Sequence, residues 1–493
     1  MAKQLRTLAR HSLVYGIGSS LAAAGSFLLI PLYTHVLTPQ EYGALELLYR
    51  IADILILVMF MGVRQAYIRF YFDDKDEGWQ QTVTGTTVIF VLLSSVVIAT
   101  VFYLLRAPVQ EGVLKETVSD QLLLLVLAWV PFEMLIAIGY ANLQVQMKSG
   151  QFVLASLARL VGFIVLNVLL VYVFRNGVAG VFTAQILVAV LIEGAILFFL
   201  VKWTPIRVSF PLMKELLRFG LPYLPAGFFM YAISNADRYF LSAYASLDAL
   251  GIYALAYKLG FTGMLYIMSP FGLVWSPFLF ENFGKPEGPA LIGRVMSLYT
   301  LVILAVGLGV AVVAPAVIPL ISGEAFHSAD AVVPMLCLAA VFYGMANLAD
   351  AGILVAKKTK YKPLVFGVGA AVAVSANFVL VPLLGIWGAA LATMLSFLAL
   401  LCVTWFVASR FYRVPLELSK FGLLFGAAGV TYAASLLAGR AVGEPFLSAG
   451  LSAATLLLFP VIVWLGGFFS VEERLAIRRF LRRPAADGSA AGG

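Results

Sequence analysis

Residues 37–50 read LTPQEYGALELLYR, and residues 245–258 read ASLDALGIYALAYK. Each stretch runs from a short turn into an apolar helix. In both, a glycine is followed at the same spacing by leucine, tyrosine and a basic residue. The two glycines, Gly43 and Gly251, are separated by 208 residues. The match predicts an internal duplication, a feature that many transporters share.

A second pair of segments supports the duplication. NGVAGVFTA begins at Asn176, and LGIWGAALA begins at Leu384. They align Gly180 with Gly388, again 208 residues apart. Two independent matches at one separation are hard to obtain by chance, so we predict that the chain contains two copies of one helical bundle.

The composition places these bundles in a membrane. Of the 493 residues, 62% are hydrophobic and 12% are charged, whereas soluble proteins have about 45–50% apolar and about 25% charged residues. A polytopic integral membrane protein is predicted, which excludes soluble enzymes, nucleic-acid binders and disordered proteins. The net charge of +8 is typical of basic cytoplasmic loops and does not indicate nucleic acid as a partner.

Apolar runs long enough to cross a bilayer, about 20 residues each, recur along the chain. The fold class is therefore an all-α integral membrane protein, for which we predict fourteen transmembrane helices. They are expected near residues 12–36, 44–68, 83–106, 122–147, 152–174, 179–202, 216–242, 250–280, 290–321, 330–356, 363–382, 386–410, 420–438 and 447–469.

Basic residues orient these helices. With the N-terminus in the cytoplasm, 25 of the 33 lysines and arginines lie in or beside cytoplasmic loops, four lie outside and four lie within spans. The positive-inside rule therefore predicts that both termini are cytoplasmic. The expected domains are an N-terminal six-helix bundle (1–206), a C-terminal six-helix bundle (207–415), two extra helices (416–470) and a basic, then disordered tail (471–493).

Two intramembrane cations occupy equivalent positions in the duplication. Arg50 and Lys258 are 208 residues apart, and each lies seven residues after the glycine at the outer end of its helix, about 10 Å deep. A cation at this depth normally faces a cavity or a partner. One interpretation is structural: the side chains extend toward the membrane surface, or Arg50 forms an ion pair with Glu46 or Asp53. The other is a pair of cations that face a shared central cavity and bind an anionic headgroup, above all a diphosphate.

Acidic side chains are also expected inside the membrane. Any of them could carry a proton or bind sodium, or could simply form a structural ion pair. The candidates for a coupling ion are Asp53, Asp237, Glu133, Glu193 and Asp350. The two cysteines and three histidines form no ligand motif, so we expect no metal site and no cofactor.

Several segments spread along the chain resemble one family of transporters. The chain is similar to the polysaccharide-export flippases of the multidrug/oligosaccharidyl-lipid/polysaccharide (MOP) exporter superfamily, and more narrowly to the bacterial O-antigen and exopolysaccharide lipid flippases. The segments are IPLYTHVLTPQEYGALELL from Ile30, GVRQAYIRFY from Gly62, LLRFGLPYLPAGFF from Leu216, NADRYFLSAYASLDALGIYALAYKLG from Asn235 and VPLLGIWGAALAT from Val381.

This resemblance implies two six-helix bundles in a V around a cationic central cavity, with two extra C-terminal helices. It implies transfer of an undecaprenyl-diphosphate-linked oligosaccharide to the outer leaflet of the bacterial inner membrane, coupled to a proton or sodium gradient or to membrane potential. The expected partners are this substrate, membrane lipids and polysaccharide polymerase machinery. Cavity roles are carried over to Arg50, Lys258, Arg64, Arg159 and Arg238.

Three other functions are weighed against this one. A peptidoglycan-precursor flippase also needs a cationic cavity, but the glycine-to-Arg-Phe-Tyr and Asp-Arg segments favour the polysaccharide branch. A cation-coupled multidrug exporter shares the superfamily fold, yet the first predicted helix has no Asp or Glu. A membrane glycan polymerase is disfavoured because the longest predicted outer loop, near residues 107–121, is too short to fold as a catalytic domain.

Overall fold

The structure is a computed structural model, and it describes residues 27–110, 118–195, 198, 207–415, 417–441 and 445–475. Throughout these ranges the secondary structure is helical, and no strand occurs. Eleven helical segments among the described residues are long and apolar enough to cross a membrane. The predicted all-α, multi-pass architecture is therefore confirmed. The count of fourteen spans stays a prediction, and most of the first expected span, 12–36, lies outside the described residues.

The described part of the first half contains helices of very different length. They are α2 (Ile30–Val36), α3 (Pro39–Phe60), α4 (Val63–Tyr71), α5 (Glu77–Leu104), α6 (Arg106–Val109), α7 (Asp120–Val145), α8 (Ser149–Asn167) with a π-helical end (Val168–Val173), and α9 (Gly177–Val188) followed by a π-helical turn (Ala189–Glu193).

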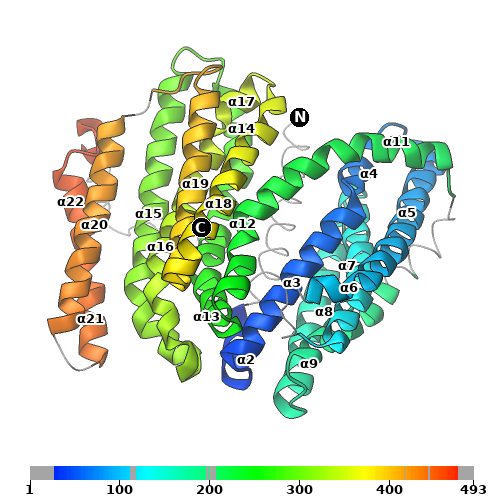
Figure 1. Cartoon of the computed structure of the whole chain (residues 1–493). Helices are drawn as coiled ribbons and strands as arrows, with labels where there is room; N and C mark the ends of the chain where they lie inside the picture. Colours follow the sequence, from blue (N-terminus) through cyan, green and yellow to red (C-terminus); the bar gives the residue numbers. More distant parts are fainter. Residues whose placement is uncertain are drawn as a thin grey trace, which may run out of the picture.

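The second half begins with a helix that runs across one end of the molecule. Its helices are α11 (Phe210–Gly220), α12 (Leu224–Tyr244), α13 (Leu247–Tyr257), α14 (Gly263–Asn282), α15 (Gly288–Ile321), α16 (Val333–Ala349), α17 (Ala351–Val355), α18 (Lys362–Leu384) and α19 (Ile386–Ala408). In Figure 1, α5–α9 lie on one side, α15, α16, α18 and α19 on the other, and α3, α12 and α13 between them.

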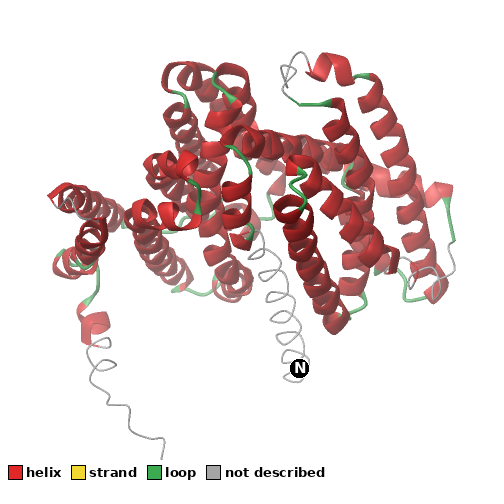
Figure 2. Cartoon of the chain, turned by 90° about the horizontal axis from the view of Figure 1, so that it is seen from below, coloured by secondary structure: helices red, strands yellow, loops and turns green. Residues whose placement is uncertain are grey.

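Three C-terminal helices stand beside this core. They are α20 (Leu418–Ala441), α21 (Pro445–Thr455) and α22 (Leu458–Leu465). α20 and α21 pack on α15, and α22 packs on α20, at the edge of the molecule remote from the first half (Figures 1 and 2). The last predicted span, 447–469, corresponds to the membrane-spanning helical segment Leu447–Leu465, in which a turn at residues 456–457 separates α21 from α22.

The start of α3 is encoded locally. Thr38 caps the helix: its hydroxyl accepts from the amide of Glu41, and the Glu41 carboxylate accepts from the amide of Thr38. This reciprocal pair satisfies two amides that the first helical turn leaves free. Pro39 follows at the first helical position, where its missing N–H costs nothing. The helix therefore begins five residues before the predicted start at residue 44.

The end of α3 is set by a tertiary contact. Met61 and Gly62 have φ values of 46° and 74°, which separate α3 from α4 and divide the expected span 44–68. A β-carbon on Gly62 would lie 2.2 Å from the carbonyl oxygen of Gly220. Glycine is therefore required both for the left-handed backbone and for the close approach of α11.

The two halves meet through the duplicated glycines. A β-carbon on Gly43 would lie 2.0 Å from the carbonyl oxygen of Leu247, and one on Gly251 would lie 2.0 Å from that of Pro39. Pro39 and Leu247 are themselves separated by 208 residues. The crossing of α3 and α13 is thus symmetric residue by residue, with the backbones in direct contact.

Candidate functional site

A cavity of about 720 Å³ lies between the two halves. It is enclosed by residues of α3, α4, α7, α12 and α18. Its apolar lining includes Phe60, Met230 and Phe366. The polar side chains that line it are those of Asp53, Arg64, Gln65, Glu133, Tyr231, Ser234 and Asn235. This is the size and composition of a pocket that binds a sizeable ligand through a few placed polar groups.

Arg50 lies beside this cavity in a network that joins the halves. Its Nε is 3.4 Å from Oε1 of Glu46, and its Nη1 is 2.9 Å from Oδ2 of Asp53. The same Nη1 donates to Oδ1 of Asn235 on α12 at 2.9 Å. The Tyr231 hydroxyl donates to the Arg50 carbonyl oxygen at 2.7 Å. The ion-pair alternative for Arg50 is therefore the one present in this conformation.

Arg238 completes the network from the second half. Its Nε is 3.5 Å from Oε1 of Glu46, and its Nη1 is 2.8 Å from Oδ1 of Asp237. The guanidinium stacks on the ring of Tyr257 at 3.7 Å. Only 3% of the Arg238 side chain is exposed. A fully desolvated arginine needs both carboxylates, because an unpaired buried charge is strongly destabilising.

Asp237 is saturated with hydrogen bonds. Besides Arg238, its carboxylate accepts from the hydroxyl of Tyr253 at 2.5 Å and from that of Thr393 at 3.0 Å. It is buried to 1% exposure. This arrangement ties α12, α13 and α19 together, and it leaves the carboxylate facing protein on every side.

Lys258 lies at the crossing of α3 and α13. Its Nζ donates to the hydroxyl of Tyr42 at 3.2 Å and stands 5.5 Å from the centre of that ring. Lys258 also begins a π-helical turn, Lys258–Thr262, between α13 and α14, and such turns often occur at functional positions. Neither Arg50 nor Lys258 is among the side chains that line the 720 Å³ cavity in this conformation.

The remaining expected cations differ in their partners. Arg159 on α8 pairs with Glu133 on α7, Nη2 to Oε2, at 2.6 Å. Arg64 on α4 lines the cavity, and within the described residues it has neither an ion pair nor a hydrogen bond. Arg64 is therefore the cavity cation with donors available for a ligand.

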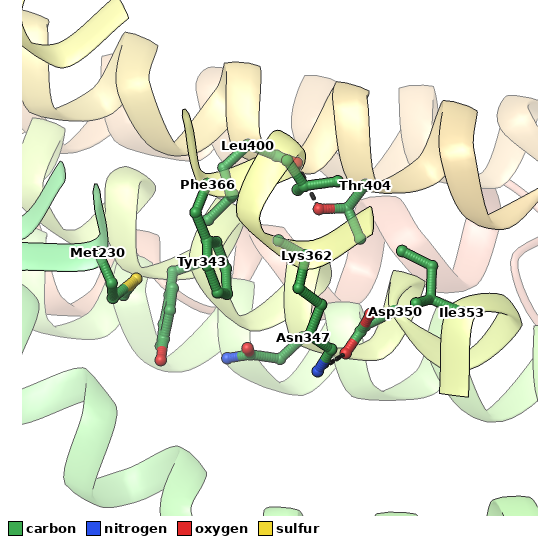
Figure 3. Close-up of a pocket in the computed structure, with 11 residues that line it drawn as sticks. Met230, Tyr343, Asn347, Asp350, Ile353, Lys362, Phe366, Leu400 and Thr404 are labelled. Atoms are coloured by element: carbon green, nitrogen blue, oxygen red, sulfur yellow. Dashed lines mark hydrogen bonds and ion pairs between the residues drawn. The ribbon is translucent and has the colours of Figure 1, made fainter. Parts of the chain in front are cut away.

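Two of the expected acids lie elsewhere. Asp350 is in the second half, where it pairs with Lys362 in a separate pocket of about 170 Å³ (Figure 3). Glu193 is in the π-helical turn after α9, and its side chain lies outside the described residues. Within the described residues, no three His, Cys, Asp or Glu side chains are placed to hold a metal ion.

Sequence reasoning identified most of the charges of this network but not its neutral members. Asn235 and Tyr231 contact Arg50, and Tyr42 contacts Lys258. Asn235 begins the quoted segment that contains Arg238, but its contact with Arg50 spans 185 residues, so helical spacing could not have indicated it. Tyr42 offered no such signal either, because its contact spans 216 residues.

Comparisons with known proteins identify a family and a set of similar folds. The sequence model of the family described as polysaccharide biosynthesis protein matches residues 8–283, more than half of the chain. No curated protein matches the sequence.

Solved structures show a similar fold. The structure of the lipid II flippase MurJ in an inward closed conformation superposes with a TM-score of 0.72 at 13% identity, covering 95% of this chain and 100% of that chain. An outward-facing multidrug transporter of the MATE family in the MOP superfamily gives 0.54 at 18% identity, over 82% and 95% of the two chains. A Vibrio cholerae MATE transporter gives 0.56 at 12% identity, over 83% and 97%.

Proposed function

The chain belongs to the family described as polysaccharide biosynthesis protein, and from this premise we propose that it is a flippase of the MOP exporter superfamily that transfers an undecaprenyl-diphosphate-linked oligosaccharide. The substrate would be an O-antigen or exopolysaccharide repeat unit, and transfer would run from the inner to the outer leaflet of the bacterial cytoplasmic membrane. The proposal includes the predicted orientation, in which both termini are cytoplasmic. The chain is a multi-pass membrane transporter of this superfamily, whose members move substrates and do not make or break their bonds.

The observation that carries the proposal is the cavity between the halves, with Arg64 on its wall and Arg50 beside it. A diphosphate cannot cross about 30 Å of hydrocarbon unaided. Arginine suits it because the guanidinium donates paired hydrogen bonds to phosphate oxygens. Arg64 offers unused donors. Arg50 can also bind the diphosphate if a phosphate oxygen replaces the carboxylate of Asp53, which is 44% exposed, as its hydrogen-bond acceptor.

The proposed mechanism is alternating access. At one end the halves are held together by the glycine crossing and by the Glu46, Arg50 and Arg238 network. Opening this end requires those contacts to separate, with the sugar and diphosphate in the cavity and the lipid tail in the bilayer. A proton or sodium gradient, or the membrane potential, would drive the cycle. Asp53 and Glu133 are the acids that line the cavity, so they are our first candidates for the coupling site.

Other functions stay open as outcomes of the experiment. The fold is similar to that of a lipid II flippase, so a peptidoglycan precursor is the second candidate substrate. A cation-coupled drug exporter is the third, because Asp53 and Glu133 in the cavity could bind a cationic drug. A glycan polymerase is the least favoured.

The decisive experiment is flipping in proteoliposomes. The protein is reconstituted with a fluorescent undecaprenyl-diphosphate oligosaccharide, and an external impermeant glycosidase reports which sugars are accessible. Wild type is measured beside the Arg50→Ala/Lys258→Ala double variant and beside Arg64→Gln. We expect flipping by wild type and strong loss in both variants. Arg64→Gln breaks no ion pair among the described residues and should keep the thermal stability of wild type. The double variant loses the ion pairs of Arg50, so it should still fold but unfold at a lower temperature.

Each other result has a clear meaning. Normal flipping by the double variant would overturn the role of Arg50 and Lys258. Flipping of lipid II but not of undecaprenyl-diphosphate oligosaccharides would assign the second substrate. Absence of flipping with every such lipid under an imposed gradient would reject the lipid substrate class.

A further inference from the structure

A second, smaller cavity opens beside the main one, inside the second half. Its volume is about 170 Å³. Met230 of α12 and Phe366 of α18 line both cavities, so the two spaces adjoin at these side chains. The small cavity is enclosed by α12, α16, α17, α18 and α19. The side chains of Met230 and Phe366 are therefore a shared wall between the main cavity and this side pocket.

The side pocket contains an ion pair with unused hydrogen-bonding capacity. Nζ of Lys362 lies 2.6 Å from Oδ2 of Asp350, and the two side chains keep 33% and 18% of their surface exposed. Lysine has three donors, and a carboxylate accepts several hydrogen bonds. Asn347 lies beside the pair (Figure 3), and within the described residues its amide has no hydrogen-bond partner.

Aromatic side chains form another part of the wall, beside aliphatic ones. Tyr343 and Phe366 line the pocket and are labelled in Figure 3. Among the described residues, the Tyr343 hydroxyl has no hydrogen-bond partner. The Thr404 hydroxyl donates to the carbonyl oxygen of Leu400 at 2.6 Å, so it remains available only as an acceptor. The pocket thus combines free donors, free acceptors and flat apolar faces.

This combination matches the chemistry of a sugar ring. Each sugar hydroxyl both donates and accepts a hydrogen bond. An ammonium group donates, a carboxylate accepts and a side-chain amide does both, so together they can pair with sugar hydroxyls. The C–H face of the ring is apolar and packs on aromatic side chains. We propose that the side pocket is a specificity subsite that binds one sugar residue of the lipid-linked oligosaccharide, through Asn347, Tyr343 and the Asp350–Lys362 pair. This inference rests on the proposed function.

The position of the pocket separates this role from diphosphate binding. The arginines beside the main cavity, Arg50 and Arg64, belong to α3 and α4 of the first half. The side pocket belongs to the second half. A substrate anchored by its diphosphate on the first half can therefore place a sugar against the second half, so that both halves contact one molecule. Its size admits a single sugar-sized group and not a whole repeat unit.

Two other roles for the Asp350–Lys362 pair predict different results. A coupling site at Asp350 would affect gradient-driven transport of every substrate equally. A purely structural tie between α18 and the end of α16 would affect stability and leave substrate preference unchanged. Of the three roles, only a sugar subsite predicts that a variant changes the relative flipping rates of substrates that differ in their sugars.

The test compares two defined lipids in the same proteoliposomes. One is undecaprenyl diphosphate without sugar, and the other is undecaprenyl diphosphate carrying a tetrasaccharide. Because a glycosidase cannot act on the sugar-free lipid, both lipids are followed by the accessibility of their diphosphate to an impermeant external pyrophosphatase. Rates are measured without and with an imposed gradient, for wild type, Asn347→Ala, Tyr343→Phe and Lys362→Gln. The control is Lys358→Gln, which removes an exposed lysine near the same end of α18 without touching the pocket.

We expect the pocket variants to lower the rate for the tetrasaccharide lipid about tenfold, a loss that corresponds to one or two hydrogen bonds. Their rate for the sugar-free lipid stays within about twofold of wild type. An equal loss on both lipids, or no change in Asn347→Ala and Tyr343→Phe, would overturn the subsite. If wild type flips neither lipid, the proposed function itself fails, and that result is recognised before any variant is compared.

Discussion

Glu46 of α3 and Arg238 of α12 form an ion pair across the two halves of the molecule, with Oε1 3.5 Å from Nε. The same oxygen lies 3.4 Å from Nε of Arg50. One carboxylate with 12% of its surface exposed therefore faces two arginines from opposite halves. It is the shared anion that holds them together at the closed end of the cavity.

Replacing Glu46 by glutamine tests this arrangement. We expect Glu46→Gln to destabilise the protein by about 1–3 kcal/mol, because the arginines lose a shared charge while Asp53 and Asp237 remain. Thermal unfolding in detergent measures the effect. Glu281→Gln removes a carboxylate that is 76% exposed and serves as the matched control. Equal stability of both variants would mean that the bridge contributes nothing.

The glycine crossing gives a second prediction. Gly43→Ala or Gly251→Ala puts a methyl group into the opposing backbone. Because backbone atoms cannot move aside as a flexible side chain can, we expect a cost of about 1–3 kcal/mol. We expect each variant to disfavour the closed crossing. Leu247 is only 6% exposed, and its carbonyl oxygen faces Gly43. A cysteine introduced at Leu247, in a background without Cys337 and Cys402, should then react faster with an impermeant maleimide.

The control for this experiment is Gly309→Ala. A β-carbon on Gly309 has no neighbour within 4 Å, so the reaction rate should remain that of the parent. An unchanged rate in both Gly43→Ala and Gly251→Ala would contradict the close contact of α3 and α13.

The sequence predicted the long helices well because a bilayer requires uninterrupted apolar runs. α15 and α19, for example, lie within a few residues of the expected spans 290–321 and 386–410. The break at Gly62 could not be predicted, since its cause is the approach of Gly220, 158 residues away. The capping sequence at Thr38 is a local signal for the start of a helix. The predicted start of this helix, residue 44, was nevertheless five residues late.

In the charged site too, contacts within one helix could be predicted from the sequence, and contacts between helices could not. Helical spacing alone placed Glu46 and Asp53 within reach of Arg50, and the structure contains both ion pairs. The contacts of Arg50 with Asn235 and of Glu46 with Arg238 depend on how α3 packs on α12, which periodicity does not encode. The side pocket around Asn347 was missed because its members come from five helices.

Two of the predicted coupling acids should behave differently. Asp53 is 44% exposed and lines the cavity, whereas Asp237 is buried and accepts hydrogen bonds from Tyr253 and Thr393. We expect Asp53→Asn to fold normally and to lose most of the stimulation of flipping by an imposed proton gradient. Asp237→Asn should instead lower stability by about 1–3 kcal/mol, because a buried, charge-assisted network is broken.

Flipping and thermal unfolding of the same preparations distinguish the two outcomes. Asp53→Glu, which keeps the charge, is the control for the first variant. Full gradient stimulation in Asp53→Asn would remove Asp53 from the coupling site, and Glu133 would be tested next.

A pH-dependent contact fastens the segment after the last described span. Nε of Arg294 on α15 donates to Oε1 of Glu473 at 2.6 Å, and the amide of Ser470 donates to Oε2 at 2.8 Å. Partial burial raises the pKa of Glu473, but the hydrogen bonds from Arg294 and Ser470 outweigh it and hold the pKa below its usual value. A depressed carboxyl pKa stabilises the folded contact above the unfolded pKa, about 4.3, and the contribution is lost as the pH falls through the folded pKa.

We therefore expect the amides of residues 470–475 to lose protection against hydrogen exchange below about pH 4, after correction for the intrinsic exchange rate at each pH. Glu473→Gln should abolish this pH dependence, because the amide cannot titrate. Glu472→Gln, at the neighbouring exposed position, should retain it. Protection that stays constant in wild type down to pH values well below 4 would show that the Arg294–Glu473 contact does not hold this segment on α15.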